Sequence, residues 1–84
     1  MQSVTIYTTP YCGFCHAAKR LLSSKGAAFD EIDVSGNPEL RQEMMQKAGR
    51  HTVPQIWIGE HHVGGFDDIN DLDMRGKLDT MLAG

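Results

Sequence analysis

The apolar and polar positions of this 84-residue sequence change their period along the chain. Residues 4–7 are β-branched or aromatic, and residues 29–34 roughly alternate apolar and acidic side chains, so both segments predict strands. Between them, apolar residues recur three and four positions apart from Gly13, which predicts a helix that ends at Gly26. The chain therefore begins with a strand–helix–strand unit, whose two parallel strands are joined by a right-handed crossover.

A second helix and a hairpin follow. Asn37-Pro38-Glu39 supplies a cap, a first-turn proline and an acid near the positive end of the helix dipole, and Gly49 ends this helix. Residues 53–58 predict a third strand. Gly59-Glu60 predicts a tight turn into a short fourth strand at residues 61–63, so this pair should be antiparallel.

Asp67 is expected to cap a last helix, which Gly76 weakens or bends. The order of elements is then βαβ, α and ββα. This order predicts an α/β fold of the thioredoxin-like kind: a four-stranded mixed sheet with helices on both faces. The length allows one domain, residues 1–84.

Composition and charge exclude several classes of protein. The apolar fraction is 40%, and no run approaches the roughly 18 apolar residues of a membrane span. The net charge of -3 argues against general nucleic-acid binding, which needs a basic surface. The N-terminus has no basic start and no long apolar stretch, so we expect no signal peptide and a cytoplasmic location.

Both cysteines of the chain lie in Cys12-Gly13-Phe14-Cys15. A two-residue spacer closes too small a loop to stabilise a fold, so this pair is poorly explained as a structural disulfide. Cys12 lies at the predicted N-terminus of the first helix, where free N–H groups, the helix dipole and Lys19 favour a thiolate. We expect its pKa to fall from about 8.5 into the range of about 3.5–7.5. Cys15, one turn later, is placed to resolve a mixed disulfide at Cys12.

Two other kinds of site use the same residues. Residues 12–16 also match the C-x-x-C-H sequence of covalent haem attachment, although the strands suit an α/β fold better. A zinc site would combine the two cysteines with two histidines. The four histidines lack the usual paired spacing and are His16, His51, His61 and His62.

Six blocks of sequence together identify a family. They are residues 6–8, 12–15, 21–26, 52–56, 64–68 and 72–78. The chain resembles the dithiol glutaredoxins, especially the small bacterial kind, over residues 4–82. The resemblance implies a glutathione-dependent oxidoreductase in which Cys12 takes the glutathionyl group from a protein and a second glutathione releases it. Cys15 would complete the reduction of protein disulfides.

The resemblance also implies a glutathione site and a set of partners. Pro54 would be cis, turning the backbone of Val53 toward the ligand; without the resemblance, a trans proline would be the expectation. Asp68 would accept from the γ-glutamyl ammonium, and Arg41 would bind the glycyl carboxylate. The implied binding residues are Arg41, Thr52, Val53, Pro54, Gly65, Asp67 and Asp68. The implied partners are glutathione, as co-substrate, and glutathionylated or disulfide-containing proteins, with the chain acting as a monomer.

Three positions depart from the family pattern. Thr9 stands where a lysine is usual, and Phe66 where a cysteine or small polar residue is frequent. Gly13-Phe14 replaces the Pro-Tyr of the commonest dithiol members and resembles the linker of cluster-binding relatives. An alternative function is therefore a [2Fe–2S] carrier or sensor, a dimer in which Cys12 of each protomer and two glutathione thiolates hold the cluster. Cys15 favours catalysis instead.

Overall fold

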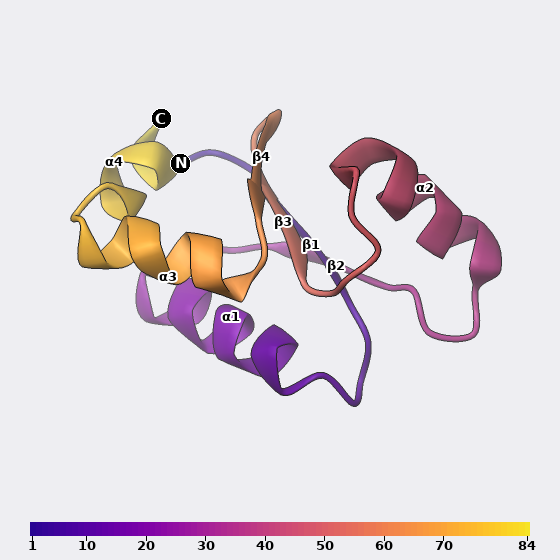
Figure 1. Cartoon of the computed structure of the whole chain (residues 1–84). Helices are drawn as coiled ribbons and strands as arrows, with labels where there is room; N and C mark the ends of the chain where they lie inside the picture. The colour runs from indigo at the N-terminus through magenta and orange to yellow at the C-terminus, as the bar shows by residue number, and fades with distance from the viewer.

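The computed structural model describes residues 1–84. Figure 1 shows the elements in the order β1 (Val4–Thr8), α1 (Gly13–Ser24), β2 (Asp30–Asp33), α2 (Pro38–Ala48), β3 (Gln55–Ile58), β4 (His61–Gly64), α3 (Phe66–Met74) and α4 (Leu78–Ala83). None of these helices is both long enough and apolar enough to cross a membrane.

The four strands form one mixed sheet in the order β2-β1-β3-β4. β1 and β2 are parallel, whereas the β1–β3 and β3–β4 pairs are antiparallel. Ile6 lies opposite Ile56, and Val4 lies opposite Ile58, so the register places these apolar side chains on one face. The predicted α/β fold with a four-stranded mixed sheet is confirmed.

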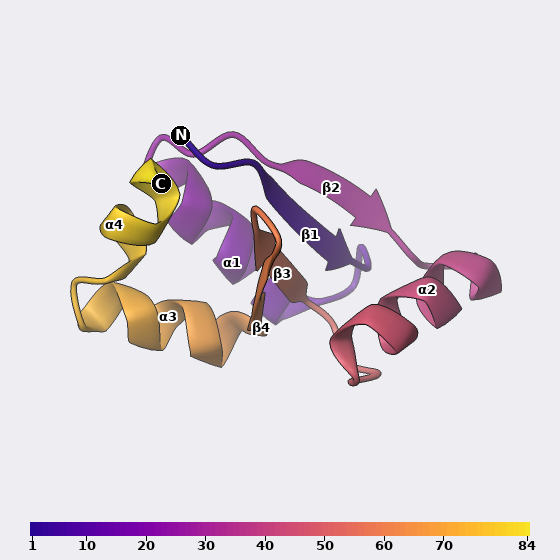
Figure 2. The ribbon, with the colours of Figure 1, turned by 90° about the horizontal axis from the view of Figure 1, so that it is seen from above.

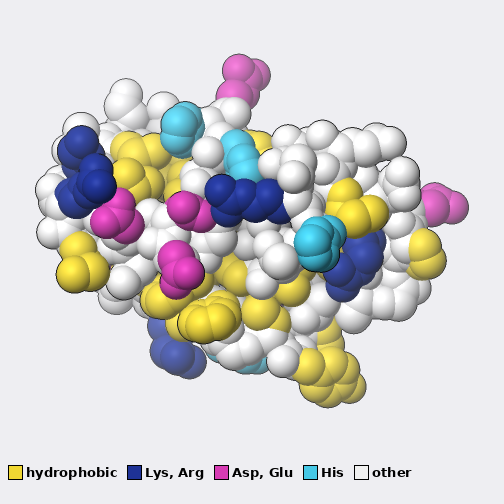
Figure 3. Space-filling view, viewed as in Figure 1, with side chains coloured by type: hydrophobic (Ala, Val, Ile, Leu, Met, Phe, Trp, Pro, Cys, Tyr) yellow, Lys and Arg dark blue, Asp and Glu magenta, His cyan; other side chains and the backbone are white.

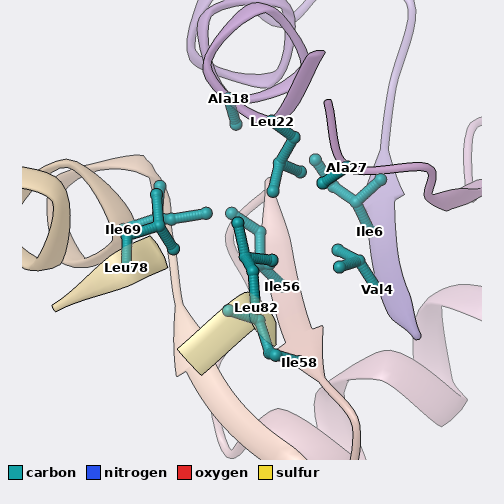
Figure 4. Close-up of a cluster of buried hydrophobic side chains, with 10 residues drawn as sticks. All are labelled: Val4, Ile6, Ala18, Leu22, Ala27, Ile56, Ile58, Ile69, Leu78 and Leu82. Carbon is teal, nitrogen blue, oxygen red and sulfur yellow. The ribbon is translucent and has the colours of Figure 1, made fainter. Parts of the chain in front are cut away.

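Helices cover both faces of this sheet, as predicted. On one face, α1, α3 and α4 enclose the larger cluster of buried side chains, which converge between the helices and the sheet in Figure 4. This cluster consists of Val4, Ile6, Ala18, Leu22, Ala27, Ile56, Ile58, Ile69, Leu78 and Leu82. On the other face, Met44 of α2 packs with Tyr7 and Val34. Figure 2 shows α2 on the side of the sheet away from α1 and α3.

Two expectations about the last helix were wrong. Gly65, not Asp67, occupies the N-cap position, and the helix already begins at Phe66. Asp68 is then the third helical residue, and its Oδ2 accepts from the Gly65 N–H at 2.9 Å. Gly76 does not bend one helix but separates two, because its φ of 72° is left-handed and incompatible with a continuing helix.

The other predicted helix ends are confirmed. The side chain of Asn37 accepts from the Leu40 N–H at 3.1 Å, which caps α2, and Gly49 ends it with a φ of 68°. The third strand is shorter than predicted, because Val53 and Pro54 precede β3 and are joined by a cis peptide bond. These two residues instead form a loop beside the N-terminus of α1, where the cysteines lie.

Candidate active site

The two cysteines occupy unequal positions at the start of α1. Cys12 is the N-cap residue, and its Sγ accepts from the backbone N–H of Cys15 at 3.0 Å. Both thiols are free; Cys12 is half-buried, whereas Cys15 is fully buried. Only Cys12 is therefore accessible to a second molecule.

Burial raises the pKa of Cys15 to about 12, with further contributions from the hydrogen bond and charge of Cys12. Because this value lies far above neutral pH, Cys15 remains a protonated thiol in the folded, reduced protein. A protonated thiol is a poor nucleophile, so Cys15 does not compete with Cys12 for a disulfide substrate.

We expect iodoacetamide at pH 8 to alkylate the folded, reduced protein once, at Cys12. Cys15 should stay unmodified because it is buried and protonated. Intact-mass measurement and peptide mapping give the number and position of the adducts. In concentrated urea both cysteines should react, which is the control. Adducts at Cys15 in the folded protein would contradict the geometry described here.

Lys19, predicted to add positive charge near Cys12, is paired with an acidic side chain. Its Nζ lies 2.9 Å from Oε2 of Glu31, which also accepts from the Thr8 hydroxyl at 2.7 Å. These two contacts, with Lys19 the larger, lower the pKa of Glu31. Glu31 therefore offsets much of the charge that Lys19 brings to this end of the molecule.

The loop before β3 contacts the accessible cysteine. The Cys12 thiol donates to the carbonyl oxygen of Val53, 3.6 Å away. The Val53–Pro54 bond is cis, which confirms that prediction. The loop thus presents the backbone of Val53 next to Cys12, where an extended peptide can pair with it.

A buried glutamine holds this loop in place. The side-chain amide of Gln55 donates to the backbone oxygen of Thr52 at 3.0 Å and to its hydroxyl at 3.3 Å. Its Oε1 lies 2.7 Å from Nε2 of His62, so the proton on that nitrogen belongs to His62. Burial, followed by the charge of Arg50, lowers the pKa of His62. No role was predicted for Gln55 or Arg50, and His62 was considered only as a zinc ligand.

A groove of about 260 Å³ continues from this loop to the N-terminus of α3. It brings together six of the predicted binding residues: Thr52, Val53, Pro54, Gly65, Asp67 and Asp68. A larger hollow of about 470 Å³ lies among the N-terminal residues and residues 26–30. Neither hollow is lined by a cysteine, but only the groove includes a residue that contacts Cys12. The groove, which shares Val53 with the cysteine contact, is therefore the better candidate for a substrate site.

Three side chains that line the groove were not among the predicted binding residues, and one predicted binding residue lies outside the groove. Phe14 and Phe66 stack with ring centroids 5.9 Å apart and form an apolar wall. Arg50 lies at the same end as Asp68, and its Nη1 is 3.0 Å from Oδ2 of that carboxylate. Arg41, on α2, is half-buried and does not line the groove.

The carboxylate of Asp68 is held in its charged form. The N–H of Gly65 and, after it, the guanidinium of Arg50 keep the pKa of this carboxyl below its ordinary value. Figure 3 shows basic, acidic and histidine side chains side by side across this face, above a group of apolar side chains. The groove thus combines apolar walls with charges of both signs.

The structure does not bring the histidines and cysteines into a zinc-binding arrangement. No group of three or more His, Cys, Asp or Glu side chains lies close enough to hold a metal ion. The accessible sulfur of the site is that of Cys12, and Cys15 is buried one turn further along.

Comparisons with known proteins agree with this chemistry. Residues 4–63 match the glutaredoxin family model. A glutaredoxin of Pseudomonas aeruginosa is 57% identical over 83 residues, which is 99% of each chain. Glutaredoxin 3 of Escherichia coli K12 is 52% identical over 82 residues, which is 98% of this chain and 99% of that protein. A buckwheat glutaredoxin, solved as a complex with glutathione, superposes with a TM-score of 0.88 at 30% identity, covering 95% of this chain and 76% of that one. The chain therefore belongs to the glutaredoxin family and is a thiol–disulfide oxidoreductase, as the resemblance implied.

Proposed function

We propose that this chain is a glutathione-dependent reductase of protein–glutathione mixed disulfides, and of protein disulfides. The observation that supports this most directly is the groove beside Cys12, which gathers six of the seven residues expected to bind glutathione. The buckwheat relative that is solved with glutathione has the same fold.

The reaction has two exchange steps, which conserve sulfur and electrons. The Cys12 thiolate attacks the glutathione sulfur of the mixed disulfide, and the protein substrate leaves as a thiolate that takes a proton. Cys12 now carries the glutathionyl group. The thiolate of a second glutathione attacks the glutathione sulfur of this adduct, releasing glutathione disulfide and restoring the Cys12 thiolate.

A protein disulfide needs the second cysteine. Cys12 attacks one of its sulfurs and forms a mixed disulfide with the substrate, and the second substrate sulfur leaves as a thiolate. Cys15 attacks the Cys12 sulfur while its proton passes to the departing substrate sulfur, which releases the reduced substrate and leaves a Cys12–Cys15 disulfide. Two glutathiones then reduce this disulfide and form one glutathione disulfide.

Six residues of the groove and Arg41, which lies outside it, bind glutathione in this proposal. The backbone of Val53 pairs with the cysteinyl part of glutathione, beside Thr52 and Pro54. Gly65 and the first N–H groups of α3, including that of Asp67, hold the γ-glutamyl carboxylate. Asp68 accepts from the γ-glutamyl ammonium. For the glycyl carboxylate we propose Arg41, which forms no ion pair within the chain.

The proposed setting follows from the co-substrate. We place the protein in the cytoplasm, where glutathione is kept reduced, and propose that residues 1–84 act as one monomeric domain. Its partners are glutathionylated and disulfide-containing proteins.

The rates at which the protein reduces two mixed disulfides of one peptide test the requirement for glutathione. One peptide is linked through its cysteine to glutathione, and the same peptide is linked to free cysteine. With excess glutathione as reductant, we expect the glutathionyl peptide to be reduced about tenfold faster or more, since only it fills the groove. Chromatography of the released peptide measures both rates. Equal rates, after subtraction of the uncatalysed reaction, would contradict a glutathione site.

A further inference from the structure

An ion pair between Arg50 and Asp68 lies at the α3 end of the groove. Arg50 Nη1 and Asp68 Oδ2 are 3.0 Å apart, and both side chains are about half exposed. Gly64 makes room for this pair: a Cβ there would collide with the Asp68 carboxylate and lie 3.1 Å from Arg50 Nη1. The φ of 116° at Gly64 also favours glycine. The backbone is thus built around a pair of opposite charges.

This pair has unused hydrogen-bonding capacity. Arg50 donates from Nη1 alone, although its guanidinium carries five N–H donors in a planar fork. Asp68 already accepts from the N–H of Gly65, so it does not depend on Arg50 for its position. Exposed ion pairs of this kind add little to folding stability. Both charges also line the groove, where a ligand can reach them.

We propose that Arg50 is a substrate-binding residue, which takes the α-carboxylate of the γ-glutamyl group. This inference rests on the proposed function and adds a residue to it. An α-amino acid group carries an ammonium and a carboxylate on one carbon, and Arg50 and Asp68 present the complementary pair of charges 3.0 Å apart. In the complex, the four charges alternate in sign: the ammonium lies against Asp68, and the carboxylate lies against Arg50.

The pair therefore selects γ-glutamyl thiols, whose free α-amino acid group reaches the α3 end of the groove while the sulfur lies at Cys12. A ligand that lacks the carboxylate makes no ionic contact with Arg50, and a ligand that lacks the ammonium makes none with Asp68. The N-terminus of α3 favours any anion, so it does not by itself make this distinction. Arg50 adds the planar, two-donor contact that a carboxylate accepts.

Binding of S-methylglutathione to the reduced protein tests the inference. This ligand has no free thiol, so isothermal titration calorimetry measures recognition without exchange. We expect Arg50→Gln to raise the dissociation constant about tenfold. Arg75→Gln is the matched control, because it removes another exposed arginine–aspartate pair outside the groove. In that pair, Nε of Arg75, the C-cap residue of α3, lies 3.1 Å from Oδ2 of Asp71. Arg75→Gln should bind as the wild type does.

Two further ligands show which charge Arg50 contacts. In one, 4-aminobutanoyl replaces the γ-glutamyl group and removes its carboxylate; in the other, glutaryl replaces it and removes its ammonium. Arg50→Gln should bind the first ligand as the wild type does and lose affinity for the second. Asp68→Asn, which keeps an oxygen for the Gly65 N–H, should show the opposite pattern.

The outcomes separate this inference from the proposed function. A wild-type protein without measurable affinity for S-methylglutathione would overturn both. If the wild type binds and Arg50→Gln changes the dissociation constant by less than about twofold, only the role of Arg50 is overturned. An equal loss of affinity for S-methylglutathione and for the 4-aminobutanoyl ligand would also overturn it, because Arg50 would then act without contacting the carboxylate.

Discussion

Replacing Cys12 by serine should remove the activity almost entirely. We expect kcat/KM for a glutathionylated peptide to fall by about a thousandfold or more, because no other accessible thiol lies in the site. A hydroxyl at this position is hardly ionised at neutral pH and forms no disulfide. The rate is measured by coupling glutathione disulfide formation to NADPH oxidation through glutathione reductase.

Cys15→Ser is the matched control for this experiment, since it makes the same substitution three residues further along α1. Circular dichroism and thermal unfolding show whether both variants are folded. Should Cys12→Ser keep more than about a tenth of the wild-type rate, the nucleophile proposed here would be wrong.

Replacing Cys15 should separate the two activities. We expect Cys15→Ser to reduce glutathionylated peptides at a rate close to that of the wild type, because both steps of that reaction occur at Cys12. Reduction of a protein disulfide in a single turnover without glutathione should fall by about a hundredfold or more, since the neighbouring thiol that resolves the intermediate is absent. A mixed disulfide between Cys12 and the substrate should accumulate and be visible on a non-reducing gel.

Because Cys15 is fully buried, a serine there places a hydroxyl in the interior. Cys15→Ala serves as a second variant that introduces no polar group. If either variant, once shown to be folded, still released reduced protein substrate at the wild-type rate, Cys15 would not be the resolving thiol.

Local sequence signals predicted most of the framework. Cys12 at the start of α1, Asn37 at the start of α2 and Gly49 at its end act through contacts within a few residues, which a pattern can reveal. The start of α3 was placed wrongly at Asp67, because acids occupy two successive positions of its first turn. The conformation of Gly65, which depends on the chain entering from β4, decides between the possible starts.

The missed parts of the site depend on tertiary structure. The contact between Arg50 and Asp68 joins residues 18 positions apart, one in the loop before β3 and the other in α3. Gln55 and His62 meet across β3 and β4, where a register irregularity between Ile56 and Trp57 shifts the pairing. No periodicity in the sequence reports such a shift, so these contacts became visible only when the strands were placed side by side.

The cap at the start of α1 links the stability of the fold to its oxidation state. The sulfur that accepts from the Cys15 N–H is the same atom that forms every disulfide of the protein in the cycle. Whatever free energy this contact gives to the thiolate form is lost when the sulfur becomes part of a disulfide. By a thermodynamic cycle, this contact raises the free energy of unfolding of the reduced protein by that amount relative to the oxidised protein. The reduction potential of the Cys12–Cys15 pair becomes more oxidising by the equivalent amount. Unfolding curves of the two forms therefore measure a redox property.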